Sequence, residues 1–314
     1  MEQKQIPLVV VVGPTASGKT WLAVELAKHY GGEVVSADSM QIYREMDIAT
    51  AKPTLEERQG IPHHLLDFLE PNRSFSVAEY SQLAHRVIAQ IHQREKLPIL
   101  AGGTGLYVDA VVDNLDFSPI ASDPSLRLEL QKLGKDQGAE HLHQMLAKVD
   151  PILANQLHPH NQGRVIRALE VYQLTGIPMS EHQRRSRMTP QLYQACFIGL
   201  GFEDRAHLYE RIDRRVDEML RSGLVEEARR VYQRYQGTAC QAIGYKELQP
   251  FLEGEQSLET CVLRLKQATR NYAKRQLTWF RKNPRIHWLL VDAAEKPEDL
   301  LKMAQNVIHK ELLL

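Results

Sequence analysis

The chain has 314 residues, 43% hydrophobic and 25% charged, which is typical of a globular protein and excludes collagen-like, disordered and disulfide-scaffold chains. Its 39 lysines and arginines balance 39 aspartates and glutamates, which excludes a protein that is basic throughout but allows a locally basic face. The three cysteines form no C-x-x-C pair, so neither a zinc site nor a redox motif is indicated. Because the start of the chain lacks a signal-peptide pattern and no apolar run reaches the length of a membrane span, we expect a cytoplasmic protein.

Short apolar segments alternate with helical patterns through the first hundred residues. The predicted elements are a strand at 6–12, a helix at 21–29, a strand at 33–36, a helix at 76–93 and a strand at 98–101. Ser76 with Glu79 three residues later predicts a capping box at the start of the helix at 76–93. This alternation predicts an α/β fold, in which helices flank a parallel sheet and ligands bind at the carboxyl ends of the strands.

The pattern changes near residue 116 and becomes wholly helical up to about 190. We therefore predict an all-helical domain at 116–190, inserted between a first part of the α/β core at 1–115 and a second part at 191–314. The predicted elements of the last part are a strand at 195–201, one charged amphipathic helix at 207–235, a helix at 258–280, a strand at 289–291 and a helix at 297–313.

The turn after the first strand matches the phosphate-binding pattern G-x-x-x-x-G-K-[ST]. It reads Gly13-Pro14-Thr15-Ala16-Ser17-Gly18-Lys19-Thr20, and we call it the phosphate loop. Glycines let the backbone N–H groups of such a loop converge on phosphate oxygens, and the following helix adds the positive end of its dipole. Lys19 supplies a charge for the terminal phosphate, and the Thr20 hydroxyl is the expected ligand of Mg²⁺. The loop predicts a bound pyrophosphate group without identifying the molecule that carries it.

A second feature argues against a nucleotide hydrolase. Such enzymes usually carry a strand that ends in an aspartate for the metal, but the third strand here runs into Gly102-Gly103 without an acidic residue. The first carboxylate near the loop is Asp38, after the second strand, where it is placed to take a proton from an attacking group. The alternative for Asp38 is an Asx turn with Ser39. At this point a small-molecule kinase using ATP is as consistent with the loop as any other phosphate-binding enzyme.

From Ser36 to Tyr43 the sequence resembles the tRNA dimethylallyltransferases, the isopentenyl-tRNA transferases of bacterial type. Further matching motifs occur in the same order along most of the chain. They are the phosphate loop, Thr50-Ala51-Lys52-Pro53, Pro62-His63-His64-Leu65-Leu66-Asp67, Gly102-Gly103-Thr104-Gly105-Leu106-Tyr107, residues 161–170, Ala242-Ile243-Gly244-Tyr245-Lys246-Glu247 and residues 269–276. Members of this family move a dimethylallyl group from its diphosphate to the exocyclic amino group of an adenosine. That adenosine lies just 3′ of the anticodon, in tRNAs that read codons beginning with U.

The resemblance implies that the phosphate loop holds dimethylallyl diphosphate and that ATP is not consumed. Lys19, Thr20 with Mg²⁺ and one arginine would neutralise the leaving diphosphate. Arg205, Arg211 and Arg215 are the candidates, and Arg211 and Arg215, four residues apart, share a helix face. We assign the catalytic roles to Asp38, Thr104, Lys19 and Arg211. The kinase remains the alternative.

The resemblance also implies a tRNA anticodon stem-loop as partner, recognised by an enzyme that we expect to be a monomer without membrane contact. The predicted tRNA-contacting residues are Asp38, Ser39, Met40, Gln41, Thr104, Arg127, Gln162, Gly163, Arg164, Val165, Ile166, Arg270 and Lys274. Residues 261–291 contain eight lysines and arginines and no acidic residue, and Lys266, Arg270 and Lys274 recur every four residues. This basic stripe predicts a helix face that contacts RNA phosphates. The target base must also leave its stack to reach a buried site.

Overall fold

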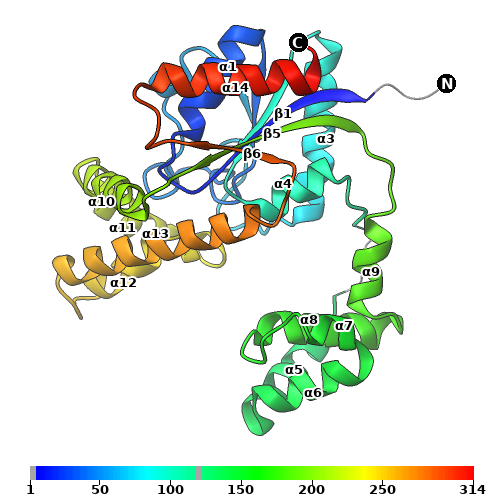
Figure 1. The fold of residues 1–314 in the computed structure, drawn as a ribbon. Coiled ribbons are helices and arrows are strands. Elements are labelled where there is room, and N and C mark those ends of the chain that lie inside the picture. Colours follow the sequence, from blue (N-terminus) through cyan, green and yellow to red (C-terminus); the bar gives the residue numbers. More distant parts are fainter. Residues whose placement is uncertain (1–4, 118–121) are drawn as a thin grey trace. The chain divides into compact units, whose positions relative to one another are not determined.

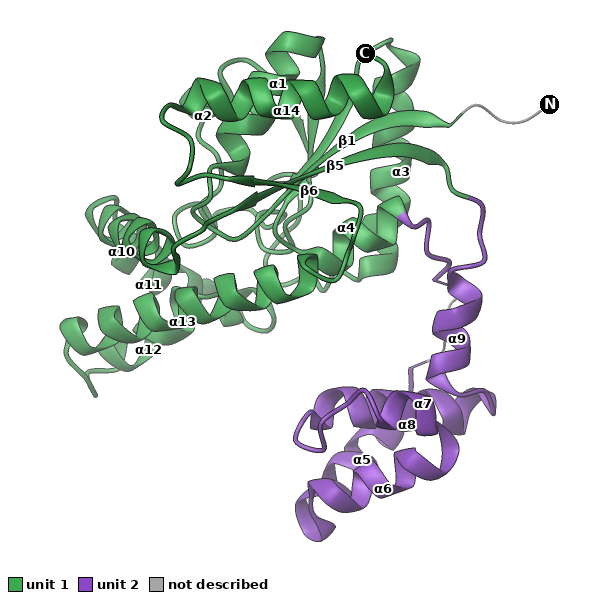
Figure 2. Ribbon diagram, in the orientation of Figure 1, with its two compact units in different colours: residues 1–112, 191–314 green, residues 113–190 purple. Residues whose placement is uncertain are grey.

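A computed structural model of the chain describes residues 5–117 and 122–314. The chain divides into two compact units (Figure 2). Unit 1 comprises residues 1–112 and 191–314, and unit 2 comprises residues 113–190. Among the described residues, no helix is both long and apolar enough to cross a membrane.

Unit 1 contains a six-stranded sheet and the helices that flank it. Its strands are β1 (Ile6–Val12), β2 (Glu33–Ser36), β3 (His63–His64), β4 (Pro98–Gly102), β5 (Tyr193–Gly201) and β6 (Ile286–Leu290). Its helices are α1 (Lys19–Tyr30), α2 (Leu55–Arg58), α3 (Val77–Gln93), α4 (Gly105–Val112), α10 (Arg205–Arg221), α11 (Leu224–Arg234), α12 (Tyr245–Leu252), α13 (Leu258–Phe280) and α14 (Pro297–Leu312), with a short 3₁₀ turn at Ala239–Gln241.

The sheet has the strand order β3-β2-β4-β1-β5-β6, and every pair is parallel. Helices α1 and α14 cover one face, and α3 and α4 cover the other (Figure 1). Successive residues of β1 alternate between these two cores: Val9 and Val11 pack with α1, whereas Val10 and Val12 pack with α3 and α4. The sheet is buried on both faces, which explains the continuous apolar run of β1. The predicted α/β fold with a parallel sheet is therefore confirmed.

Helix boundaries follow local chemistry where a capping residue is present. The predicted capping box at Ser76 and Glu79 is formed and starts α3. The prediction of one helix at 207–235 is wrong, because the chain turns at Gly223 and divides the segment into α10 and α11. Gly223 has φ +97°, a conformation that other residues rarely adopt, and its position marks the break. Four elements, namely α2, β3, α4 and α12, were not predicted from the sequence.

Helices α10 to α13 form a helical lobe of unit 1 with an apolar core of its own. Val216, Leu224, Tyr245 and Leu265 are buried in this core together with Ile42 and Tyr43, which lie in the segment after β2. The lobe therefore packs against the loop that leaves β2. This contact brings α10 and α13 to the carboxyl edge of the sheet.

Unit 2 is helical and closes around its own apolar core. Its helices are α5 (Pro124–Gln137), α6 (Ala139–Val149), α7 (Pro151–Ala154), α8 (Gln162–Thr175) and α9 (Met179–Ser186). Leu130, Leu142, Leu146 and Leu169 lie at the centre of this core. Leu142 and Leu146 lie four residues apart on α6, and such helical spacing within each helix is why the helical character of this region was readable from the sequence.

Candidate active site

A cavity of about 670 Å³ opens at the carboxyl edge of the sheet in unit 1. The phosphate loop after β1, the Asp38–Gln41 turn after β2 and the end of β4 line one side of it, and helices α10 and α13 line the other. Parallel strands place their following loops at one edge, so three turns far apart in sequence meet here. Among the described residues, no group of three or more His, Cys, Asp or Glu side chains is arranged to hold a metal ion by itself.

The phosphate loop has the curled backbone that its sequence predicts. Gly13 approaches β5 so closely that a Cβ atom there would lie 2.7 Å from the carbonyl oxygen of Leu200. Gly18 adopts φ +94° and caps α1, which begins at Lys19. Lys19 Nζ donates to the carbonyl oxygen of Pro14 at 2.7 Å, so the ammonium curls over the loop. The Ser17 hydroxyl is buried and has no hydrogen-bond partner among the described residues.

The cavity holds cations that lack enough carboxylates to balance them. Burial and the neighbouring Arg215 guanidinium lower the pKa of Lys19 from its usual 10.5 to about 7, with Asp38 acting in the opposite direction. Burial likewise lowers the pKa of Arg215, against the effect of Glu57 and Asp38. Two buried cations, each disfavoured in its charged form by burial, would both be stabilised by an anion placed between them. The electrostatics of the cavity thus favour an anionic ligand such as a diphosphate.

The two arginines on the shared face of α10 play different parts. Arg211 lines the cavity but is exposed, and its Nε donates to the carbonyl oxygen of Ala16 at 2.8 Å, so it supports the phosphate loop. Arg215 lies deeper: its guanidinium is 3.4 Å from the Thr15 hydroxyl and 3.5 Å from the carbonyl oxygen of Ala51. Arg215 is therefore better placed than Arg211 to neutralise a buried diphosphate. The third candidate, Arg205, is the first residue of α10 and is exposed.

Asp38 makes the Asx turn that the sequence offered as one interpretation, and its role as a base stays a prediction. Its Oδ1 accepts hydrogen bonds from the backbone N–H groups of Met40 at 2.9 Å and Gln41 at 3.4 Å, which makes the Asx turn. No described residue donates to its Oδ2. One carboxylate oxygen thus fixes the turn while the other stays available in the cavity as a proton acceptor.

Thr104 joins the turn after β4 to the turn after β2. Its Oγ1 accepts the N–H of Ser39 at 3.0 Å and donates to the Ser39 hydroxyl at 3.3 Å. The close approach is possible because the residue before this turn lacks a side chain: a Cβ on Gly102 would lie 2.2 Å from the carbonyl oxygen of Ala37. Thr104 therefore holds the Asp38 turn in place, and a direct contact of Thr104 with substrate stays a prediction.

Two residues of α13 that the sequence analysis did not select tie this helix to the site. Gln276 is buried, accepts the N–H of Thr15 at 2.8 Å and donates to the carbonyl oxygen of Gly103 at 3.0 Å. Tyr272 hydrogen-bonds Thr104, and burial raises the pKa of its hydroxyl. Gln276 thus bridges the phosphate loop and the turn after β4. Tyr272, Arg275 and Gln276 share one helix face by their spacing, but that spacing does not indicate which loops they contact.

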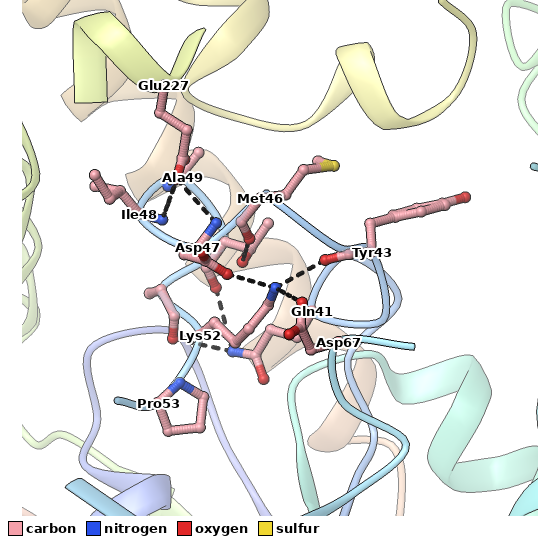
Figure 3. Close-up of polar contacts among 12 residues, drawn as sticks. Gln41, Tyr43, Met46, Asp47, Ile48, Ala49, Lys52, Pro53, Asp67 and Glu227 are labelled. Atoms are coloured by element: carbon pink, nitrogen blue, oxygen red, sulfur yellow. Dashed lines mark hydrogen bonds and ion pairs between the residues drawn. The ribbon is translucent and has the colours of Figure 1, made fainter. Parts of the chain in front are cut away.

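The segment after the Asp38 turn forms a further wall of the cavity. Residues 47–52, which we call the arch, close on themselves through a hydrogen bond from the N–H of Lys52 to the carbonyl oxygen of Asp47 at 2.9 Å. Gln41 donates its amide to the carbonyl oxygens of Thr50 and Ala51 at 3.2 and 3.1 Å (Figure 3). This amide therefore ties the Asp38 turn to the arch, and contact of Gln41 with tRNA stays a prediction.

Comparison with known proteins decides the family. The sequence model of the IPP transferase family matches residues 41–283. The chain belongs to the IPP transferase family. It is 50% identical over 301 residues to the tRNA dimethylallyltransferase of Caldanaerobacter subterraneus subsp. tengcongensis, covering 94% of this chain and 95% of that one. It is 52% identical over 306 residues to the tRNA dimethylallyltransferase of Geobacillus kaustophilus, covering 96% of both chains.

Solved structures of IPP transferases have the same fold. The full-length tRNA isopentenylpyrophosphate transferase of Bacillus halodurans is similar with a TM-score of 0.73 and 43% identity, covering 97% of both chains. A eukaryotic dimethylallyltransferase acting on tRNA has a TM-score of 0.79 and 29% identity, covering 98% of this chain and 80% of that one. These matches confirm the resemblance that the sequence motifs indicated.

The basic stripe of this IPP transferase is less basic than its sequence implies. Lys266 forms an ion pair with Asp217 at 2.7 Å, and Arg270 pairs with Asp213, both from α10. Arg270 also lies over the ring of Tyr209. Lys274 is exposed and forms no ion pair among the described residues. The face of α13 that carries Lys266 and Arg270 therefore packs on α10, and only Lys274 of the three is presented as a free cation.

Unit 2 separates its predicted RNA contacts into exposed and buried groups. Gln162, Gly163 and Arg164 are exposed in the first turn of α8. Val165 and Ile166 are buried in the core of unit 2, so the expectation of RNA contact through these two side chains is not supported. Arg127 binds the buried carboxylate of Glu170 at 2.9 Å beside Arg167 at 2.8 Å. Arg127 thus has a structural partner, and its contact with RNA stays a prediction.

Proposed function

We propose that this IPP transferase transfers a dimethylallyl group from dimethylallyl diphosphate to the exocyclic amino group of a tRNA adenosine, the one 3′ of the anticodon in tRNAs that read codons beginning with U. In the reaction the adenosine nitrogen forms a bond to C1 of the dimethylallyl group, the bond from C1 to the diphosphate oxygen breaks, and the amino group loses a proton. The observation that carries the proposal is the cavity in which Lys19 and Arg215 face Asp38.

The donor side of the cavity suits a diphosphate leaving group. Lys19, Arg215 and the N–H groups of the phosphate loop stabilise the negative charge that develops as the C1–O bond breaks. Arg211 supports the loop through Ala16. The Thr20 hydroxyl of the loop would hold Mg²⁺, and the described residues offer no carboxylate cage for it. This fits Mg²⁺, which keeps waters and substrate phosphate oxygens as its other ligands. When bound, the ion would add further charge stabilisation to the diphosphate.

The acceptor side of the cavity suits removal of a proton from the adenine amino group. Asp38 keeps Oδ2 available while Oδ1 fixes the turn, so the carboxylate has a defined direction without being fully hydrogen-bonded. Thr104 and Ser39 hold that turn against the end of β4. A base held in this way acts on the amino group as the new bond forms.

The RNA contacts fall into two groups. In unit 1, Ser39 and Met40 line the cavity, and exposed Lys274 meets phosphates. In unit 2, the exposed first turn of α8 meets the anticodon stem through Gln162, Gly163 and Arg164. In this proposal residues 116–190 form a helical domain that binds the anticodon stem, while the α/β core of the enzyme binds the target base.

A kinase that uses ATP is not favoured. The relatives named above are transferases acting on tRNA, and they match this chain over nearly its full length. No carboxylate ends β4 beside the phosphate loop, as the sequence shows. The same loop therefore serves a prenyl diphosphate here.

The proposal is tested by incubating the purified protein with dimethylallyl diphosphate, Mg²⁺ and unmodified tRNA, digesting the tRNA and weighing its nucleosides. We expect dimethylallyl adenosine at the predicted position, and none with Asp38→Asn, which keeps the Oδ1 acceptor of the turn but removes the base. The tRNA affinity of Asp38→Asn should equal that of the wild type. Consumption of ATP on a small acceptor, with no new nucleoside, would overturn the proposal.

A further inference from the structure

Glu227 is a buried carboxylate outside the cavity that no motif singled out. It lies on α11 and is 1% exposed. Its two oxygens accept four hydrogen bond donors: the N–H groups of Asp47 and Ile48 at 2.9 Å, that of Ala49 at 2.9 Å and the Tyr245 hydroxyl at 2.9 Å. Within residues 5–117 and 122–314 no lysine, arginine or histidine forms an ion pair with it. A buried charge with neutral partners is costly unless its donors are closely arranged around it.

Three of these four donors are consecutive residues of the arch, so the carboxylate sets the path of the arch backbone. The arch needs this support, because Ala51 adopts φ +50°, a left-handed conformation that costs free energy for a residue with a Cβ. A second clamp acts at the other end of the arch. Lys52 is nearly buried and donates to the carbonyl oxygen of Tyr43, to Asp47 and to Asp67 at 2.8, 2.6 and 2.6 Å (Figure 3).

One atom of the arch, the carbonyl oxygen of Ala51, connects the arch to residues of the cavity. The carbonyl oxygen of Ala51 accepts the Gln41 amide at 3.1 Å and lies 3.5 Å from the Arg215 guanidinium. Gln41 belongs to the turn that Asp38 organises, and Arg215 faces Lys19. The same carbonyl oxygen therefore touches the residue on the acceptor side and the arginine on the donor side.

From this geometry we infer that Glu227 is a positioning residue of the transfer site. It holds the arch so that the Ala51 carbonyl fixes Gln41 and Arg215 together. The inference rests on the proposed function for its kinetic readout. The inference goes beyond the proposed function because it assigns a role to α11. The Glu227 carboxylate of this helix has no hydrogen bond to the phosphate loop among the described residues and acts through residues 47–49.

The test compares Glu227→Gln with Glu226→Gln, which makes the same chemical change at the exposed neighbouring residue of α11. Glutamine is isosteric, but it has one oxygen for four donors and turns an NH₂ group toward the arch amides. We expect kcat/KM for transfer in Glu227→Gln to fall tenfold to a hundredfold, on the order of the loss from slight misplacement of reacting groups. Glu226→Gln should match the wild type.

A double-mutant cycle separates positioning from a loss of stability. If Glu227 acts through the arch on Gln41, then Gln41→Ala costs much less activity in the Glu227→Gln protein than in the wild type. A purely structural role would give additive losses, or a lower melting temperature with unchanged kcat/KM, and either result would overturn the inference. Should Glu227→Gln fail to fold, Tyr245→Phe removes one donor only and is expected to lower kcat/KM about threefold. An unchanged value in that variant would also overturn it.

Binding of inorganic pyrophosphate, measured by calorimetry on the same proteins, tests the Arg215 side without requiring transfer. We expect weaker binding in Glu227→Gln than in Glu226→Gln, and equal affinities would contradict the inference. If the wild type makes no dimethylallyl adenosine, the proposed function fails. The pyrophosphate result then still decides whether Glu227 positions the anion site.

Discussion

Two groups of cations in unit 1 look alike in the sequence and differ in the fold. Lys19 and Arg215 lie in the cavity, where burial lowers the pKa of both and the Arg215 guanidinium lowers the pKa of Lys19 further. Lys266 and Arg270 of α13 are instead neutralised by Asp217 and Asp213 of α10. The difference teaches that the role of a cation depends on the carboxylates that other elements bring to it. A basic stretch of helix that lacks acidic residues of its own becomes a paired surface when a neighbouring helix supplies them.

The largest expected effect comes from removing an unpaired cation of the cavity. Lys19→Met should lower kcat/KM for transfer by about a hundredfold to a thousandfold, because a charge that stabilises the leaving diphosphate is lost. The matched control is Lys266→Met, which removes a lysine already paired with Asp217 and should leave turnover at saturating tRNA close to the wild-type value. Steady-state kinetics of both variants measure the difference. Equal losses would remove the distinction between the two groups.

The second effect separates the two arginines of α10. Arg215→Lys should reduce kcat/KM more than Arg211→Lys, by roughly a hundredfold against roughly tenfold, because lysine cannot reproduce a planar guanidinium at a buried anion site. Arg211 braces the loop from the exposed side and can be replaced at lower cost. The KM for dimethylallyl diphosphate of each variant is the measurement. A larger loss for Arg211→Lys would reverse the assignment.

A smaller effect concerns the salt dependence of tRNA binding. Lys274→Gln should reduce the slope of log affinity against log salt concentration by about 0.7, as expected for one lost phosphate contact to single-stranded RNA. Arg270→Gln should leave the slope unchanged and lower the melting temperature, since it leaves Asp213 without its partner. Affinity titrations at four salt concentrations measure both. A reduced slope in Arg270→Gln would mean that its ion pair opens to RNA.

The smallest effect concerns the paired charges of unit 2. Burial acts to raise the pKa of Glu170, but hydrogen bonds from Arg167, Arg127 and the Asp123 backbone outweigh it and lower the pKa from 4.5 to about 2. As the pH falls, the Glu170 carboxylate takes up a proton at a higher pH in the unfolded chain than in the folded one. The contribution of Glu170 to stability is therefore present above pH 4.5 and is lost as the pH falls toward 2. Glu170→Gln should therefore destabilise unit 2 at pH 7 and flatten its acid unfolding between these values. Circular dichroism at a series of pH values measures the acid unfolding of both proteins. An unfolding curve of Glu170→Gln that matches the wild-type curve would contradict this prediction.

What the sequence made predictable was local. Apolar runs and helical spacing within single segments predict the bounds of β1, β2 and α13. The spacing of Ser76 and Glu79 likewise predicts the capping box of α3. The phosphate loop and the Asp38 turn were found because each is a short contiguous motif. The division of α10 from α11 was missed, because the periodic pattern continues across Gly223 while the backbone turns there.

The support of the site was not readable in this way. Gln276 contacts Thr15 across 261 residues of chain, and Glu227 contacts Ile48 across 179. No spacing rule relates such positions, because each contact joins segments that are far apart in the chain and meet only in the folded structure. The pairing of Arg270 with Asp213 was hidden for the same reason, which is why the basic stripe appeared more available to RNA than it is.

The central claim is that the unpaired cations of the cavity hold the diphosphate of a prenyl donor. The most direct measurement is the stoichiometry of one reaction, in which pyrophosphate released and dimethylallyl adenosine formed are quantified in the same sample with ATP present. We predict one pyrophosphate for each modified adenosine, no phosphate released from ATP, and loss of both products together in Lys19→Met. Pyrophosphate or phosphate released without a modified nucleoside would contradict the account.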